Sequence, residues 1–279
     1  MLPLDLVLVL AGLVGGFAAG LIGIGGGIVF APVLVLYFQS AGVADELVIP
    51  LAIGTSLMCT LLTSLVSAQS HYSRNAVNVR IAIATGVASA IAVLLTTTLV
   101  TTQPWYDRQV FAIAFSAILV VVAVRMLLDK TPHEPQAGPL PPRSTSAVRL
   151  TRLAATGSVA GVVSSAVGVG GGVVLVPAYN RLLKLPMHVA VGTSSATIIL
   201  ISIFGVASYV VQGMGDAATA SSLGFVDPLR ALYLSIPAAL TARAGVWASH
   251  RINQRRLQKG FAVFAILVAI RLVVGALVA

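Results

Sequence analysis

Long apolar segments dominate the sequence. Eight of them occur within 279 residues, and most reach or exceed the roughly 20 residues that an α-helix needs to cross a bilayer. They span residues 4–38, 48–71, 80–100, 109–128, 153–185, 188–212, 228–249 and 260–279. Only 9% of the residues are charged, against about 25% in a typical soluble domain, so little polar sequence remains to coat a soluble core. The sequence predicts an all-α, polytopic membrane protein.

Two of these segments, residues 4–38 and 153–185, are too long for one crossing. As a single helix, 35 residues would extend about 52 Å, whereas the hydrocarbon core is about 30 Å thick. Each segment also has a glycine cluster near its middle, where a helix is weakened by roughly 1 kcal/mol per glycine. We expect two broken helical hairpins, re-entrant or fully crossing, with one long tilted helix as the alternative.

The two halves of the chain resemble each other. Residues 23–32, Gly-Ile-Gly-Gly-Gly-Ile-Val-Phe-Ala-Pro, match residues 168–177, Gly-Val-Gly-Gly-Gly-Val-Val-Leu-Val-Pro. A Gly-Thr-Ser triplet follows each stretch, at 54–56 and 192–194. Repetition in the same order indicates an internal repeat. We therefore expect a first transmembrane repeat over residues 1–128, a Pro-rich cytoplasmic linker over 129–149 and a second repeat over 150–279.

Charge placement predicts how the repeats are oriented. Four loops hold twelve of the 17 Lys and Arg residues, and basic loops of membrane proteins face the cytoplasm. These twelve are Arg74, Arg80, Lys130, Arg143, Arg149, Arg152, Arg181, Lys184, Arg251, Arg255, Arg256 and Lys259. Each repeat is then a broken hairpin plus three transmembrane helices, and the two repeats have opposite topology, a recurring transporter architecture. Both termini are predicted to lie outside the cytoplasm. The first apolar segment has no basic region before it, so we expect it to be retained.

The glycine clusters are the first candidates for a binding site. Where a helix resumes after a break, its free N–H groups and its dipole attract anions. Hydroxyl groups of the Gly-Thr-Ser triplets could complete an oxyanion cage or bond to their own helices. An arginine within a membrane span is a further candidate, although it could instead extend to the interface. The predicted substrate-binding residues are Gly25, Gly26, Gly27, Ile28, Thr55, Ser56, Gly170, Gly171, Gly172, Val173, Thr193, Ser194 and Arg243. Close helix packing is the alternative role for the glycines.

Other functional classes find little support in the sequence. All eight acidic residues lie near termini, loops or helix ends, which argues against a carboxylate cation pump. The single cysteine and the four histidines suggest neither a metal site nor a cofactor, and a nucleotide-binding loop and nucleic-acid motifs are absent from the sequence. The expected partners are a small anion and the lipid bilayer, and a homo-oligomer is left open. An intramembrane enzyme and a non-catalytic subunit are the rival classes.

These motifs resemble the sulfite exporter TauE/SafE family. The resemblance rests on the paired glycine-rich stretches, on the Gly-Thr-Ser triplets and on the tail that begins at Pro237, and it covers nearly the whole chain. It implies a non-enzymatic secondary transporter, usually an exporter, for a sulfur-containing anion such as sulfite or an organosulfonate such as sulfoacetate, in the bacterial inner membrane. A passive anion channel and an uptake permease for the same anions are the alternatives. Arg243 departs from the family pattern, where this position is small or apolar.

Overall fold

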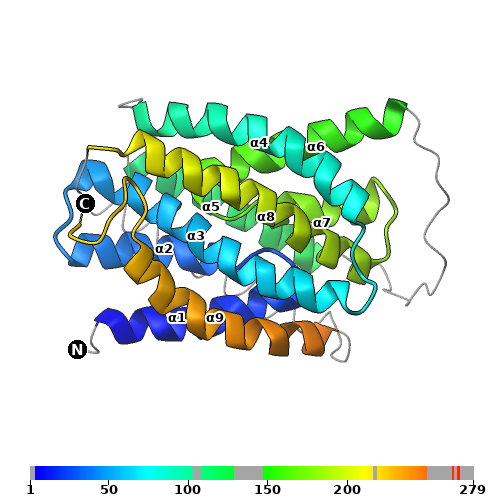
Figure 1. The fold of residues 1–279 in the computed structure, drawn as a ribbon, viewed down its shortest axis with the longest axis horizontal. Helices are drawn as coiled ribbons and strands as arrows, with labels where there is room; N and C mark the ends of the chain where they lie inside the picture. The colour runs from blue at the N-terminus through cyan, green and yellow to red at the C-terminus, as the bar shows by residue number, and fades with distance from the viewer. Residues whose placement is uncertain are drawn as a thin grey trace.

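The chain folds into a bundle of nearly antiparallel helices (Figure 1). The computed structural model describes residues 4–102, 108–128, 147–215 and 219–249, together with 266, 269 and 270. Its helices are α1 (Leu4–Ile22), α2 (Gly27–Ser40), α3 (Asp45–Tyr72), α4 (Val79–Thr102), α5 (Arg108–Leu128), α6 (Ala147–Val167), α7 (Gly172–Arg181), α8 (Met187–Gln212) and α9 (Pro228–Ser249). Within these ranges the chain has no β-strand, only one isolated bridge. The all-α prediction is confirmed.

Helix lengths match those of a multi-pass membrane protein. In the described residues, five helices are long and apolar enough to cross a bilayer, and they belong to α1, α3, α4, α6 and α8. By contrast, α2 has 14 residues and α7 has 10, so they extend only about 21 Å and 15 Å. Each hairpin therefore pairs a helix of membrane-spanning length with one too short to cross the roughly 30 Å hydrocarbon core.

Both long apolar segments are broken, as the sequence predicted. The first is divided at residues 23–26 and the second at 168–171. Figure 1 shows α1 starting and α2 ending at one end of the bundle, whereas α6 starts and α7 ends at the other. The α3–α4 and α7–α8 connections lie at the α6 end, and the α2–α3 and α8–α9 connections lie at the α1 end (Figure 1). Most of the predicted linker, residues 129–146, and most of the predicted span 260–279 lie outside the described residues.

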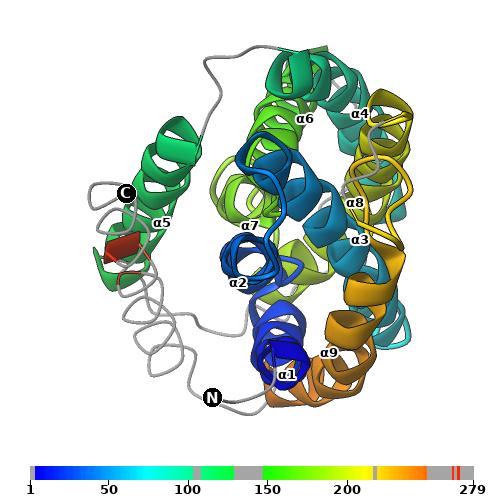
Figure 2. The ribbon, with the colours of Figure 1, turned by 90° about the vertical axis from the view of Figure 1, so that its left-hand side faces the viewer.

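Small residues hold two pairs of helices in close contact on opposite sides of the bundle (Figure 2). On α1, a Cβ atom added at Gly12, Gly16 or Gly20 would lie 2.0–2.3 Å from a carbonyl oxygen of α9. On α6, added Cβ atoms at Gly157 and Gly161 would lie 2.4 and 2.5 Å from carbonyl oxygens of α4. Glycines spaced by four let membrane helices approach to backbone contact. Between these pairs, α3 packs on α8, beside the short helices α2 and α7 (Figure 2).

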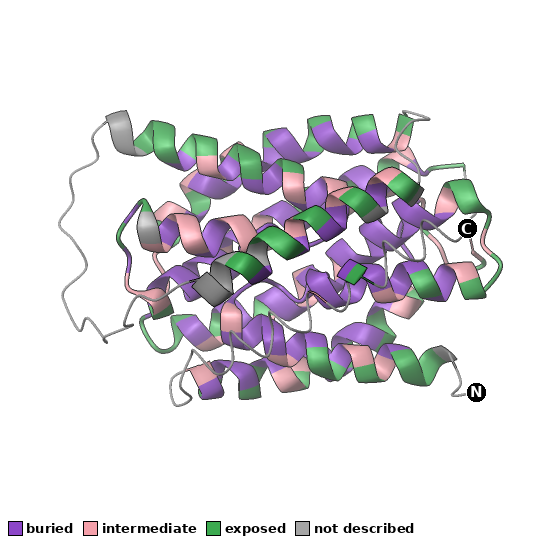
Figure 3. Ribbon diagram, turned by 180° about the vertical axis from the view of Figure 1, so that it is seen from behind, coloured by how far each residue is buried: buried purple, intermediate pink, exposed green. Residues whose placement is uncertain are grey.

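The outer helices each have an exposed face (Figure 3), and many of the exposed residues are large and apolar. On α4, the exposed positions include Ile83, Val87, Ile91 and Leu94, which recur every three or four residues along one face. Most buried positions of the same helix carry small or hydroxyl side chains, such as Ser89. This inversion of the soluble pattern is the one expected of helices that contact lipid tails.

Candidate functional site

Each broken segment resumes as a helix directly after a glycine in the left-handed conformation. Gly26, with φ 83°, caps α2, and Gly171, with φ 76°, caps α7. The glycines before them repeat the same backbone, with φ 78° at Gly25 and 81° at Gly170. A residue with a side chain is strained at such φ values. The sequence placed the starts of the second helices near Ile28 and Val173, and in the structure they start one residue earlier.

The two breaks lie directly against each other, although about 145 residues separate them in sequence. A Cβ atom at Gly27 would lie 2.3 Å from the carbonyl oxygen of Gly168, and one at Gly172 would lie 2.4 Å from the Cα atom of Ile24. The structure therefore brings together both glycine clusters and the first residues of α2 and α7, with Ile28 fully buried. At this contact the glycines are needed for close backbone approach as well as for φ.

The serines of the two Gly-Thr-Ser triplets brace the breaks from the opposite half of the chain. Ser56 on α3 donates a hydrogen bond to the carbonyl oxygen of Gly168, at 2.8 Å. Ser194 on α8 donates to the carbonyl oxygen of Gly23, at 2.9 Å. Both serines are fully buried. Each break thus depends on a helix from the other half for a hydrogen bond at its bend.

The threonines of the same triplets fix the starts of two other helices. Thr55 Oγ1 accepts a hydrogen bond from the backbone N–H of Asp227, just before α9, at 2.9 Å. Thr193 Oγ1 accepts one from the N–H of Asn78, just before α4, also at 2.9 Å. Sequence analysis placed these hydroxyls either in an anion cage or on their own helices. In the structure they connect the two halves.

Two other hydroxyls at the breaks were missed by sequence analysis. Thr60 Oγ1 and Ser64 Oγ are fully buried on α3 and have no hydrogen-bond partner in the described structure. The Thr60 methyl group lies 2.6 Å from the position of a Cβ atom on Gly25 and 2.5 Å from that on Gly170. Ser64 Oγ lies 3.3 Å from the Gly25 position. A detectable signal existed, because Ser56, Thr60 and Ser64 are four residues apart and share one helix face.

Arg243, by contrast, is not gathered into this site. It is exposed on α9, whereas its neighbour Ala242 is buried against Gly20 of α1. The predicted cation of the site therefore lies on the outer surface of the bundle. Among the described residues there is also no group of three or more His, Cys, Asp or Glu side chains that could hold a metal ion.

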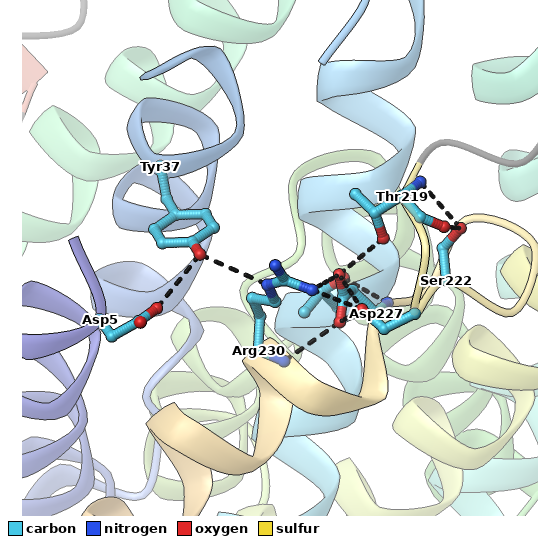
Figure 4. A network of polar contacts seen from close by, with 8 residues as sticks. Asp5, Tyr37, Thr219, Ser222, Asp227 and Arg230 are labelled. Atoms are coloured by element: carbon cyan, nitrogen blue, oxygen red, sulfur yellow. Dashed lines mark hydrogen bonds and ion pairs between the residues drawn. The ribbon is translucent and has the colours of Figure 1, made fainter. Parts of the chain in front are cut away.

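A polar network surrounds the start of α9 (Figure 4). The buried carboxylate of Asp227 accepts hydrogen bonds from Thr219, Ser221 and the backbone of Arg230, and it pairs with the Arg230 guanidinium at 3.2 Å. Arg230 Nε donates to the Tyr37 hydroxyl at 3.4 Å, and Tyr37 donates to Asp5 at 3.2 Å. The network therefore joins the start of α9 to α1 and α2.

The sequence model of the sulfite exporter TauE/SafE family matches residues 8–272 of the chain. The chain belongs to this family. A "Probable membrane transporter protein" of Haemophilus influenzae is 29% identical over 279 residues, which cover 98% of this chain and 99% of that protein. A probable membrane transporter protein of Methanocaldococcus jannaschii is 28% identical over 258 residues, which cover 92% and 90% of the two chains. No solved structure matches the chain.

Membership of the TauE/SafE family confirms the resemblance found in the sequence. Together with the relatives and the apolar helices, it indicates a multi-pass membrane transporter of the TauE/SafE type. The relatives are named for transport and not for catalysis.

Proposed function

We propose that this TauE/SafE protein is a secondary transporter, acting as an exporter, for a small sulfur-containing anion such as sulfite or an organosulfonate. The observation that carries the proposal is the contact between the two helix breaks. There two helices, α2 and α7, begin side by side after left-handed glycines. The first N–H groups of a helix have no partner within it, and the helix dipole adds partial positive charge at the same point.

The proposed binding site is formed by backbone and hydroxyl groups. Residues 25–28 and 170–173 offer N–H donors to the anion, as phosphate-binding helix starts do. The buried, unpartnered hydroxyls of Thr60 and Ser64 add donors beside Gly25. Ser56 and Ser194 hold the two bends in position through their hydrogen bonds. Arg243 is left out of this site because its position is exposed.

Transport would proceed by alternating access between two halves that form an inverted repeat. The opposite ends at which the two hairpins begin support this arrangement (Figure 1). With the basic α3–α4 and α7–α8 connections in the cytoplasm, the linker is cytoplasmic and both termini lie on the outer side of the bacterial inner membrane. The site at the breaks would then open in turn to each side as the halves rock against each other.

Sulfite counterflow in proteoliposomes tests this proposal. A carrier should show saturable exchange, which is accelerated by sulfite on the opposite side of the membrane. Gly26→Leu and Gly171→Leu should each abolish exchange without preventing membrane insertion, because both positions require positive φ and are crowded. Gly42→Leu is the matched control, since Gly42 has φ 75° but nothing within 4 Å of its Cβ position. Wild-type exchange rates in both Gly26→Leu and Gly171→Leu would show that the anion does not bind at the breaks. A non-saturating, ohmic current would favour a channel over a carrier.

A further inference from the structure

The two helix breaks have nearly identical backbones but different side chains around them. Thr60 of α3 and Ile198 of α8 both lie at the contact between the breaks. Ile198 Cγ2 is 3.4 Å from the Cβ position of Gly25 and 3.3 Å from that of Gly170, and the Thr60 methyl group is closer still to both. These two residues hold equivalent places in the repeats, five residues after Thr55 and Thr193. One is polar and the other is apolar.

The hydroxyl of Thr60 is unusual within its own helix. Buried Thr63 donates to the carbonyl oxygen of Cys59, four residues earlier, at 2.8 Å, and Ser70 does the same to Val66. Thr60 and Ser64 make no such bond and have no other partner in the described structure, although both are fully buried. Leaving a buried donor unpaired costs free energy, so these hydroxyls are the groups expected to meet a polar ligand.

Threonine can present its hydroxyl at the breaks without a change in the backbone. In helices threonine populates two χ1 rotamers, and Oγ1 in one of them occupies the place that the methyl group holds in the other. The Thr60 methyl already touches both breaks, so a rotation would bring Oγ1 to the same place. Ser64 Oγ faces Gly25 without any rotation.

Two isoleucines of α8 lie against the second break, beside the Thr60 methyl group. A Cβ atom at Gly172 would lie 3.0 Å from Ile198 Cδ1, and one at Gly171 would lie 3.1 Å from Ile201 Cδ1. Both isoleucines are fully buried. An oxyanion oxygen placed against them would lose its hydration without gaining a donor, whereas an alkyl group would be favourably buried. At the joined breaks, unpartnered hydroxyls thus come from Thr60 and Ser64 of α3, whereas α8 contributes the Ile198 and Ile201 side chains beside the Ser194 brace.

We propose that Ile198 determines specificity, that Thr60 supplies a donor to the oxyanion group, and that the preferred substrate is an oxyanion carrying a short apolar substituent. The oxyanion group is oriented toward the start of α2, where Thr60 and Ser64 donate to it, and the substituent packs on Ile198 and Ile201. A fully inorganic oxyanion is polar on every side and fits this site less well. This inference rests on the proposed function, since it assigns an orientation to the anion within the same site.

Competition in the counterflow assay tests the inference. Unlabelled ethanesulfonate or hydrogensulfite would compete with labelled substrate in a mildly acidic buffer, where sulfite is mostly a monoanion and the charges are matched. Wild-type protein should prefer ethanesulfonate by about tenfold, the factor typical of one small apolar group in a pocket. Ile198→Thr should reduce this preference to near unity. Ile198→Val should keep it, because valine has the shape of threonine without the hydroxyl.

Thr60→Val should weaken both competitors by about tenfold, because it removes one donor at constant shape. Thr63→Val is the matched control and should leave both unchanged, since the Thr63 hydroxyl is bound to its own helix. Thermal unfolding of each purified variant verifies folding. Equal competition by both anions in wild type, or equal effects of the two Ile198 variants, would overturn the specificity inference alone. Absence of exchange with either anion by folded wild-type protein would overturn the proposed function itself.

Discussion

Thr55 of α3 and Thr193 of α8 each hold the start of another helix, at opposite ends of the bundle. The residues that they hold differ in charge. At one end Thr55 of α3 accepts the N–H of Asp227, and at the other Thr193 of α8 accepts the N–H of Asn78. Both partners precede a helix and accept a hydrogen bond from the third residue along, Arg230 or Ile81. Asp227 is in addition the centre of a charged network, whereas Asn78 is neutral.

The helix breaks likewise combine a repeated backbone with side chains that differ. Backbone angles and serine braces are duplicated, but Thr60 on one side corresponds to Ile198 on the other. The comparison teaches that the repeated parts are those that backbone geometry demands. The parts that differ are side chains that can bind a solute or hold one end together. Paired variants that remove equivalent atoms from the two halves can therefore distinguish residues needed for folding from residues needed for transport.

The largest effect is expected where the scaffold is most crowded. Gly27→Ala and Gly172→Ala each insert a methyl group within 2.4 Å of the opposite break, so both should cost about 3 kcal/mol and abolish transport. The two losses of stability should be similar, because each added methyl group would press on the backbone of the other break. Thermal unfolding in detergent and counterflow would measure them. If one variant is tolerated at wild-type stability, the two breaks are not equivalent.

A smaller and unequal effect is expected at the two helix starts. Asp227→Ala removes the acceptor of at least three side chains and a helix cap and should cost about 2 kcal/mol, with the partly exposed Arg230 limiting the loss. Asn78→Ala removes a cap alone and should cost about 1 kcal/mol. Chemical denaturation of the two variants compares them. Equal losses would mean that the charged network adds nothing to stability.

The serine braces should give equal and moderate effects. Ser56→Ala and Ser194→Ala each remove one buried hydrogen bond between the halves, worth about 1 kcal/mol in membrane proteins. Ser70→Ala is the control, because its hydroxyl bonds only within its own helix. Melting temperatures of the three variants are the readout. A control that destabilises as much as the braces would argue against a link between the halves.

The smallest effect is expected at Arg243. This residue is exposed on α9, so Arg243→Gln should change stability by less than about 0.5 kcal/mol and leave exchange intact. The exposed position keeps this side chain away from the contact between the two breaks. Counterflow with wild-type and variant protein measures the difference. A strong loss of anion affinity in Arg243→Gln would show that Arg243 contributes to anion binding.

Sequence patterns predicted the two helix breaks but not the side-chain partners around them. The breaks at residues 23–26 and 168–171 could be found because only glycine tolerates that backbone, and the excess length of each segment required an interruption. The partners of Ser56 and Ser194 lie 112 and 171 residues away, and no local pattern encodes such distances. Arg243 was included because charge in a span suggests function, but the sequence does not tell which face of α9 points outward. Thr60 was missed because hydroxyls are common in membrane helices, and the shared helix face of Ser56, Thr60 and Ser64 was overlooked.

The position of a bound anion would show whether the two helix breaks form the binding site. A crystal structure with a selenium analogue of the substrate, such as an alkylselenonate, would give an anomalous peak at the position of the central atom. We expect that peak between residues 25–28 and 170–173, on the side of Thr60 and Ser64. A peak at Arg230, at Arg243 or anywhere else, with the two breaks empty, would contradict it.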